Sequence, residues 1–316
     1  MQGASSTRRL NLGCGYDRRE GYLNVDLQDF HSPDLIADIR DLPMLSSGHF
    51  EEILAFDCLE HLPRTDSARA LEEWNRLLTP GGTLRLTVPD AAAILQRLAA
   101  SDDLEEHERW LANLFGTQAY TGDFHQAGFT DILMIGLLAR TGYCGIRIER
   151  RDDWLLSVFA RKSYSPRPLE DDVALCWGEG VYPAEPAGEA TMRWSRQQAN
   201  VLLENLTGRD VDCRLRTIFF TGTAEPSTLE VRSDFFADVL TLDDRCPWER
   251  VVTMGPQRLR VFFSTDARAL EAADDPRALH FGMYDFQISV ELPRAANRSI
   301  ELGRGEIGEV SSTHGA

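Results

Sequence analysis

The chain has 316 residues with 33 Lys or Arg against 50 Asp or Glu, giving a formal net charge of −17 at pH 7. A surface of this sign repels phosphate backbones, so nucleic acid is not expected as a partner. The hydrophobic fraction of 43% is sufficient for packed cores, and the length favours about two domains.

The six cysteines are scattered, with no Cys-x-x-Cys pair and no Cys/His cluster. This spacing argues against a disulfide scaffold and against a zinc site, so no metal is expected. The first residues lead directly into an apolar strand without a signal segment, and no apolar run reaches the length of a membrane span. We therefore expect a reduced, cytoplasmic protein.

Residues 8 to 162 alternate short apolar runs with segments of helical period, which predicts a parallel sheet covered by helices. The expected strands are residues 9–12, 22–27, 35–39, 52–56 and 83–88. Asp66 can cap a helix that presents Leu71, Trp74 and Leu78 on one face, ending at Pro80-Gly81-Gly82.

Helical spacing continues over residues 91–120 and again over 130–139. The runs 145–149 and 154–160 are typical of a hairpin, which we expect to close the edge of the sheet. We place the first domain at residues 1–162, and a linker at the charged, proline-containing stretch 163–172.

Beyond the linker, short β-type runs are separated by turn clusters, which predicts an antiparallel β-sandwich over residues 173–302. The tail 303–316 is rich in glycine and serine and is expected to be disordered. The predicted fold class is therefore α/β, a Rossmann-like doubly wound sheet followed by an antiparallel sandwich.

A turn with two glycines follows the first strand in the motif LNLGCG (10–15), and the next strand ends in NVD (24–26). Gly13 and Gly15 allow the main chain to turn tightly and to approach a ligand closely. A carboxylate at the end of the second strand, Asp26, can accept hydrogen bonds from two ribose hydroxyls. The pattern favours a nucleoside-binding corner.

These motifs are followed by ADIRDLP (37–43), LEHL (59–62), LLTPGG (77–82) and TVPD (87–90). In this order they resemble the class I S-adenosylmethionine (SAM) dependent methyltransferases, most closely a compact bacterial branch. The resemblance covers residues 8 to 162. It implies a Rossmann-like fold, methyltransferase activity and SAM as cofactor.

The resemblance also implies roles for individual residues. Gly13, Cys14 and Gly15 would lie along the methionine part of SAM, and Asp57 would line the methionine end. Asp26 would hold the ribose, and Asp38 would bind the adenine amino group with the backbone of Ile39 beside it. His61 would lie with Glu60 at the mouth of the pocket. Glu60 is equally well explained as a solvated acid at a helix start, and His61 as a residue that hydrogen-bonds behind the site.

Only ten residues separate Gly15 from Asp26, against about twenty in dinucleotide-binding folds. A full first helix does not fit, and only a turn around Asp17 to Glu20 is expected. A dinucleotide needs that helix end for its pyrophosphate, whereas SAM has no phosphate. The short connection argues against NAD and is compatible with SAM.

Methylation of a hydroxyl usually needs a base to take its proton. The first candidate is His125, in the motif YTGDFH (120–125) that precedes GFT (128–130), and the second is Asp90 at the end of the fifth strand. His125 could instead serve only to hold the loop. Trp110, Phe115 and Tyr120 are candidates for an acceptor pocket, although their spacing is more typical of core residues.

In the second domain, the motifs CWGEGVY (176–182), MRW (192–194) and DPR (275–277) resemble β-sandwich modules appended to glycosyltransferases and methyltransferases of bacterial surface-polysaccharide clusters. Exposed aromatic faces could stack on sugar rings, with Trp177, Trp194 and Trp248 as candidates. Burial in the sandwich core is the more common outcome for such residues.

Together these features favour a SAM-dependent methyltransferase that acts on a sugar hydroxyl of a bacterial glycan or glycolipid intermediate. The alternatives are methylation of a small secondary metabolite and a non-catalytic carbohydrate-binding or scaffold protein that retains the fold. The expected partner is a carbohydrate or small-molecule acceptor, with no integral membrane segment. Association with membrane-bound glycan machinery and homo-oligomer formation stay open.

Overall fold

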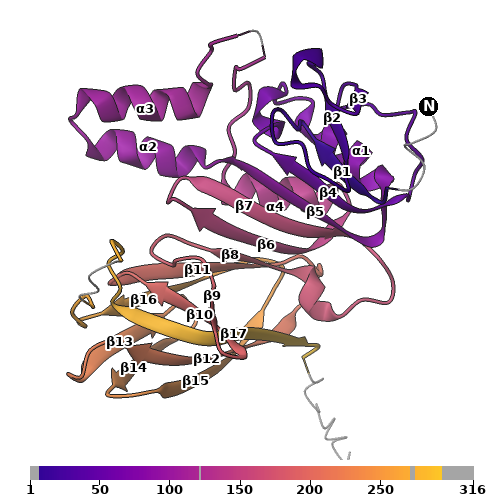
Figure 1. The fold of residues 1–316 in the computed structure, drawn as a ribbon. Coiled ribbons are helices and arrows are strands. Elements are labelled where there is room, and N and C mark those ends of the chain that lie inside the picture. The colour runs from indigo at the N-terminus through magenta and orange to yellow at the C-terminus, as the bar shows by residue number, and fades with distance from the viewer. Residues whose placement is uncertain (1–6, 121, 271–274, 294–316) are drawn as a thin grey trace, which may run out of the picture.

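The computed structural model describes residues 7–120, 122–270 and 275–293. An N-terminal α/β unit lies above a C-terminal β-sandwich in Figure 1. The predicted fold class, a Rossmann-like sheet followed by an antiparallel sandwich, is confirmed. The tail predicted at 303–316 lies outside the described residues.

Within its described residues, the α/β unit contains four α-helices, two short 3-10 turns and seven strands. The helices are α1 (Ser67–Leu77), α2 (Ala91–Ala100), α3 (Leu104–Phe115) and α4 (Asp131–Arg140), and the turns are η1 (Asp29–His31) and η2 (Leu59–His61). The strands are β1 (Arg9–Leu12), β2 (Leu23–Asp26), β3 (Leu35–Ile36), β4 (Phe50–Phe56), β5 (Leu78–Pro89), β6 (Tyr143–Arg151) and β7 (Leu155–Lys162).

Two helix predictions need correction. Leu78 was expected on the face of α1, but its backbone is extended and it begins β5. Pro80 disfavours helical backbone at Thr79, so the helix ends before that residue. The predicted helix over residues 91–120 is two helices that pack together. The Asp103 carboxylate accepts a hydrogen bond from the Glu106 backbone at 2.9 Å and thereby starts α3 as a separate element.

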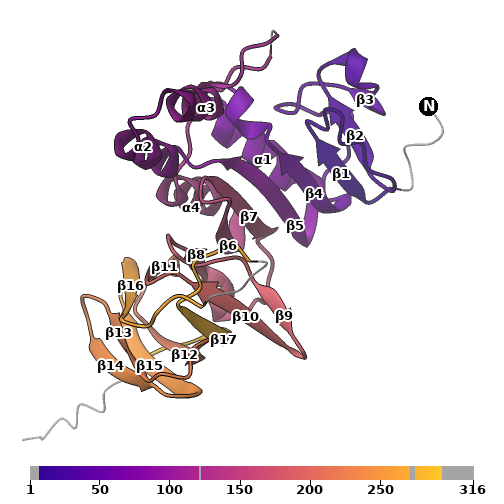
Figure 2. The same cartoon turned by 60° about the vertical axis from the view of Figure 1, so that its left-hand side comes forward.

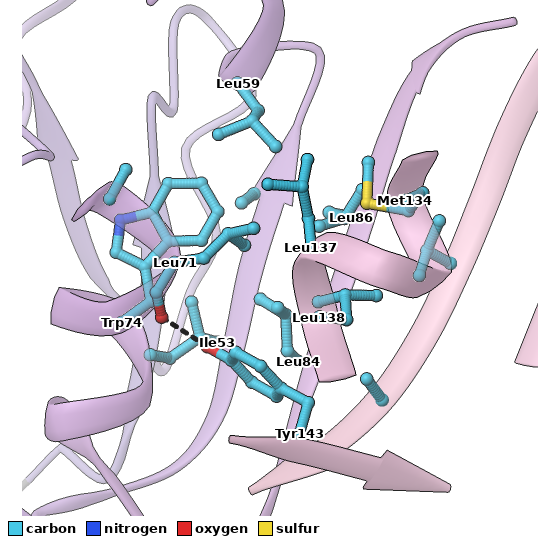
Figure 3. Close-up of a cluster of buried hydrophobic side chains, with 14 of the residues drawn as sticks. Ile53, Leu59, Leu71, Trp74, Leu84, Leu86, Met134, Leu137, Leu138 and Tyr143 are labelled. Atoms are coloured by element: carbon cyan, nitrogen blue, oxygen red, sulfur yellow. Dashed lines mark hydrogen bonds between the residues drawn. The ribbon is translucent and has the colours of Figure 1, made fainter. Parts of the chain in front are cut away.

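Strands β3, β2, β1, β4 and β5 pair in parallel in that order, and β7 joins β5 antiparallel. Helices α1 and α4 contact each other and bury their apolar sides against this sheet (Figure 3). The Tyr143 hydroxyl donates to the Leu71 carbonyl at 3.0 Å, and the Trp74 indole donates to the Ile39 carbonyl at 2.9 Å. The buried aromatic side chains are therefore both packed and hydrogen-bonded.

The connection between β1 and β2 is a short loop, as the spacing of the glycine motif predicts. Two buried asparagines support it. The side-chain oxygen Oδ1 of Asn24 accepts from the side-chain amide of Asn11 at 3.0 Å and from the Arg19 backbone N–H at 2.8 Å. These bonds satisfy the polar groups of a turn that has no helix to pack on.

The hairpin of β6 and β7 does not close the edge of the sheet, contrary to expectation. Strand β8 (Val173–Trp177) pairs in parallel with β6, aligning Leu175 with Arg147. Every residue of β8 is buried, so the strand is stable only where both of its edges and faces are covered. The sheet of the α/β unit thus continues without a break into the sandwich, to a total of twelve strands (Figure 2).

The sandwich has two layers that enclose a second hydrophobic core. One layer is the far half of the twelve-stranded sheet, in the order β14-β13-β16-β11-β8, and the other is a separate sheet in the order β15-β12-β17-β10-β9. The strands are β9 (Glu185–Ala187), β10 (Ala190–Ser195), β11 (Gln198–Asn205), β12 (Val211–Thr221), β13 (Ser227–Arg232), β14 (Ala237–Leu242), β15 (Cys246–Met254), β16 (Arg258–Thr265) and β17 (Phe281–Glu291), and η3 (Leu169–Asp172) precedes β8. Among the described residues, none of the helices is long and apolar enough to cross a membrane.

Candidate functional site

A cavity of about 370 Å³ lies at the carboxyl ends of β1, β2 and β4, where parallel sheets of this type bind ligands. Its volume is within the roughly 300–1,000 Å³ typical of small-molecule sites. The lining residues are Gly13, Gly15, Asp26, Leu27, Gln28, His31, Asp38, Ile39, Arg40, Asp57, Cys58, His61, Leu62, Pro63, Tyr120, Gly122 and Gln126.

The glycine turn and the second strand meet at one corner of this cavity. The Gly15 backbone N–H donates to Oδ2 of Asp26 at 2.8 Å, and the Gln28 backbone donates to Oδ1 at 2.9 Å. His31 Nδ1 donates to the same Oδ1 at 3.0 Å. A carboxylate offers about four acceptor positions, so Oδ2 can still accept a further hydrogen bond.

Gly13 brings the main chain against Cys58 at the wall of the cavity. Its φ is +59°, and a Cβ at this position would be 2.4 Å from Cys58 Cβ. Gly15 has a similar φ of +49°, but a Cβ there would have nothing within 4 Å. The positive φ therefore favours glycine at both positions, and at Gly13 the close approach to Cys58 also leaves no space for a Cβ.

Gly13→Ala is expected to lower the free energy of unfolding by about 2–5 kcal/mol, since left-handed strain and overpacking both contribute. The matched Gly15→Ala variant has the strain alone and is expected to lose about 1–2 kcal/mol. Urea denaturation of both variants measures the difference. Equal losses would contradict the close packing of Gly13 on Cys58.

Another part of the cavity wall is formed by Asp38, Ile39 and Arg40. The Arg40 guanidinium donates to both oxygens of Asp38 at 2.6–3.0 Å and to Asp66 at 2.6 Å. These bonds hold the pKa of the Asp38 carboxyl below its usual range. Asp38 is therefore fixed as an acceptor in this part of the wall.

Asp57 follows β4 in a left-handed conformation, with φ +48°. This backbone is strained for a residue with a side chain. The Thr87 hydroxyl on β5 donates to the Asp57 carboxylate at 2.8 Å, and the Asp57 N–H donates to the Thr87 carbonyl at 3.1 Å. Two strands thus hold the carboxylate in place at the cavity wall.

His125 is brought to η2 by the loop that follows α3. The Gln126 and Ala127 backbone N–H groups donate to the Glu60 carbonyl at 2.7 and 3.1 Å, and the Gln126 side chain donates to the His61 carbonyl at 2.8 Å. The imidazoles of His61 and His125 meet edge to face, with ring centroids 4.8 Å apart. The structure thus joins two histidines that are distant in sequence.

Glu60 is buried beneath these histidines, with 2% of its surface exposed. Burial raises the pKa of its carboxyl to about 8, and the nearby Asp57 adds to the effect. The solvated role suggested for Glu60 by the sequence is therefore wrong. Burial and the neighbouring His61 lower the pKa of His125.

Three of the predicted site residues, Asp90, Cys14 and His125, do not line the cavity. Asp90 is fully buried, accepts hydrogen bonds from the Ala92 and Ala93 backbones, and pairs with Arg150 at 2.8 Å. These contacts show a structural role instead of the suggested role as base. The Cys14 thiol is also buried, which raises its pKa to about 11.

Four further cavity residues, His31, Gln28, Cys58 and Gln126, were not expected from the sequence. They have no periodicity or spacing that marks them, because their positions depend on the folded loops. Of the three aromatic residues suggested for an acceptor pocket, Tyr120 lines the cavity. Trp110 is buried and packs edge to face on Trp154, while Phe115 is exposed away from the lining.

The tryptophans of the sandwich are core residues. Trp177, Trp194 and Trp248 are 5–9% exposed. The Arg193 guanidinium lies 4.2 Å from the centre of the Trp177 ring, and the Trp248 indole donates to Asp238 at 2.9 Å. Their faces are thus covered, and the suggestion that they stack on sugars is wrong.

Several solved structures are similar in part to this chain. One is a possible exported protein from Bordetella parapertussis, with 13% identity over 50% of this chain and 62% of that chain and a TM-score of 0.38. A SAM-dependent methyltransferase from Archaeoglobus fulgidus has 13% identity over 50% of this chain and 87% of that chain, with a TM-score of 0.38. The 1,6-didemethyltoxoflavin-N1-methyltransferase of Burkholderia thailandensis, solved with S-adenosylhomocysteine, has 17% identity over 49% of this chain and 71% of that chain, with a TM-score of 0.35. This chain thus spans less than two thirds of the Bordetella protein.

No curated protein matches the chain significantly. A family model does match, and it covers residues 9–133 with all of the cavity-lining residues. That model describes a methyltransferase domain.

Proposed function

We propose that this chain is a SAM-dependent methyltransferase that methylates a sugar hydroxyl of a bacterial glycan or glycolipid intermediate. The observation that carries the proposal is the cavity at the carboxyl ends of the strands, with the Gly13 turn and Asp26 at one corner and Asp38 in another part of its wall. This spacing of a close backbone approach and two acceptor carboxylates suits an adenosyl group joined to a sulfonium. The family match over residues 9–133 supports it.

Different residues of the cavity would bind different parts of SAM. Asp26 would accept from the ribose hydroxyls, Asp38 would accept from the adenine amino group, and the Gly13 turn would leave room for the methionine part. When bound, SAM supplies an activated methyl group. The protein aligns the acceptor oxygen with that group and excludes water, which makes proximity its main contribution.

The acceptor enters beside the loop that contains Tyr120 and Gln126, which forms the wall facing η2. The imidazole of His61 lines this end, and that of His125 lies behind it. Neutral sugars suit a site of this kind better than nucleic acid, given the net charge of −17. The resemblance of the sandwich to modules of surface-polysaccharide enzymes is the reason for proposing a glycan.

We assign catalysis to residues 1–162 and an accessory role to the sandwich at 173–302, with the cytoplasm as the proposed location. Since the tryptophans of the sandwich are buried, any acceptor contact there has to use other side chains. The continuous sheet of twelve strands supports a fixed placement of the sandwich next to the methyltransferase domain.

Calorimetric titration with SAM and S-adenosylhomocysteine tests the cofactor, and we expect micromolar binding of both. Transfer of a labelled methyl group to extracted surface glycans and to a panel of small metabolites then tests the acceptor. Mass spectrometry of the host glycan with and without the protein should reveal one lost methyl group. Transfer only to metabolites would support the small-molecule alternative, and absence of SAM binding would support a scaffold.

A further inference from the structure

We propose that Glu60, His61 and His125 bind a divalent transition-metal cation, such as Zn²⁺, at the acceptor end of the cavity. One ligand atom from each of these residues lies within 4.8 Å of the others. Ligand atoms at about 2.1 Å from a tetrahedral ion lie about 3.4 Å apart. Side-chain rotations that bring these atoms closer by up to about 1.4 Å are therefore sufficient to complete the site.

Both imidazoles are oriented as metal-binding histidines usually are. His61 Nδ1 donates to the Phe124 carbonyl at 3.2 Å, and His125 Nδ1 donates to the Asn113 carbonyl at 3.1 Å. A backbone acceptor at Nδ1 fixes the tautomer in which Nε2 carries the free lone pair. The His61 ring is thus held by the loop that carries His125, and the His125 ring by the end of α3, which leaves the two Nε2 atoms as the available ligands.

The third ligand is a buried carboxylate that lacks a partner. Glu60 Oε2 has no hydrogen-bond donor within the described parts of the chain, and its side chain is 2% exposed. Leaving a buried polar atom unpaired costs roughly 1–3 kcal/mol. Such atoms are rare in folded proteins unless a water molecule, an ion or a ligand satisfies them. A cation between Glu60 and the two histidines supplies the missing partner.

The donor set also indicates the type of metal. Two imidazoles with one carboxylate suit Zn²⁺, Fe²⁺ and related first-row ions, whereas Mg²⁺ and Ca²⁺ prefer oxygen ligands. Three protein ligands leave positions open for other donors, as in catalytic sites. Since His61 lines the cavity, an acceptor hydroxyl can occupy one of these positions. This last step rests on the proposed methyltransferase function, and it makes His125 a metal ligand instead of the expected base.

Metal-stripped, untagged full-length protein titrated with ZnCl₂ in a calorimeter tests the site, with Co²⁺ absorption as a second probe of imidazole ligation. We expect one Zn²⁺ per chain at micromolar affinity or tighter, and a loss of at least tenfold in Glu60→Gln and in His125→Ala. His107→Ala is the matched control, because His107 on α3 bonds the Ser101 carbonyl outside the cluster. Circular dichroism and SAM titration of each variant establish that it is folded.

Absence of Zn²⁺ binding below about 100 µM, or binding that both cluster variants retain, would overturn the metal site. If such protein still binds SAM, the proposed function stands without a metal. If folded protein binds neither, the metal site and the proposed function are both wrong. Glu60→Gln keeps the shape of the side chain and removes its charge, so it separates loss of a ligand from loss of packing.

Discussion

Replacing Arg150 with methionine is expected to lower the free energy of unfolding by about 3–5 kcal/mol, because it leaves two buried carboxylates without their cation. Arg150 on β6 donates to Asp90 at 2.8 Å and to Asp131 at 3.1 Å, and its own side chain is 14% exposed. Asp90 caps α2, and Asp131 begins α4. One guanidinium therefore joins two helices to the centre of the twelve-stranded sheet.

Urea denaturation of Arg150→Met measures this loss, and Arg69→Met is the matched control. Arg69 pairs with Asp41 at 3.3 Å, and both side chains are about 60% exposed, so the control is expected to change stability by about 0–1 kcal/mol. Adding Asp90→Asn to Arg150→Met should recover part of the loss, since one uncompensated charge is removed. If Arg150→Met were as stable as the control, the structural role assigned to Asp90 would be wrong.

Asp26→Asn is expected to weaken SAM binding about 10- to 100-fold. Hydrogen bonds to a charged group contribute about 1.5–3 kcal/mol, and 1.4 kcal/mol corresponds to a factor of ten. The substitution removes one acceptor oxygen and places an NH₂ group where the carboxylate receives donors from Gly15, Gln28 and His31. The substitution thereby removes the negative charge proposed to face the ribose and also disrupts the hydrogen bonds that hold this side chain.

Calorimetry at a temperature where the variant is folded measures this effect. Asp29→Asn is the matched control, because Asp29 is an exposed carboxylate three residues further along the chain. It changes the net charge by the same amount and should leave SAM affinity unaltered. Equal affinity in the two variants would exclude Asp26 from the cofactor site.

Residues that are neighbours both in the chain and in space could be placed at the cavity from the sequence. The LNLGCG turn and Asp26 belong to adjacent parallel strands joined by a short loop, so their meeting at Gly15 follows from local chain geometry. The same holds for Asp38 and Ile39, which follow the next strand. Seven predicted cofactor residues therefore line the cavity.

Asp90 shows where this reasoning fails. Its place at the end of β5 suggests a site residue, because carboxyl ends of parallel strands face the ligand. The structure instead pairs it with Arg150, which lies sixty residues further along the chain. A carboxylate at a strand end acts as a base or as a helix cap depending on a partner that no local pattern reveals.

Strand alternation, the glycine turn and the short β1–β2 connection were determined by the sequence itself, because backbone conformation and the burial of alternate side chains are local properties. Only the tertiary structure decided that β8 extends the first sheet beyond the β6–β7 hairpin, and that the loop after α3 brings His125 against Glu60 and His61. Both depend on contacts between distant segments. The free energy of burying an edge strand or a carboxylate is set by which surfaces meet, and that is established only when the chain has folded.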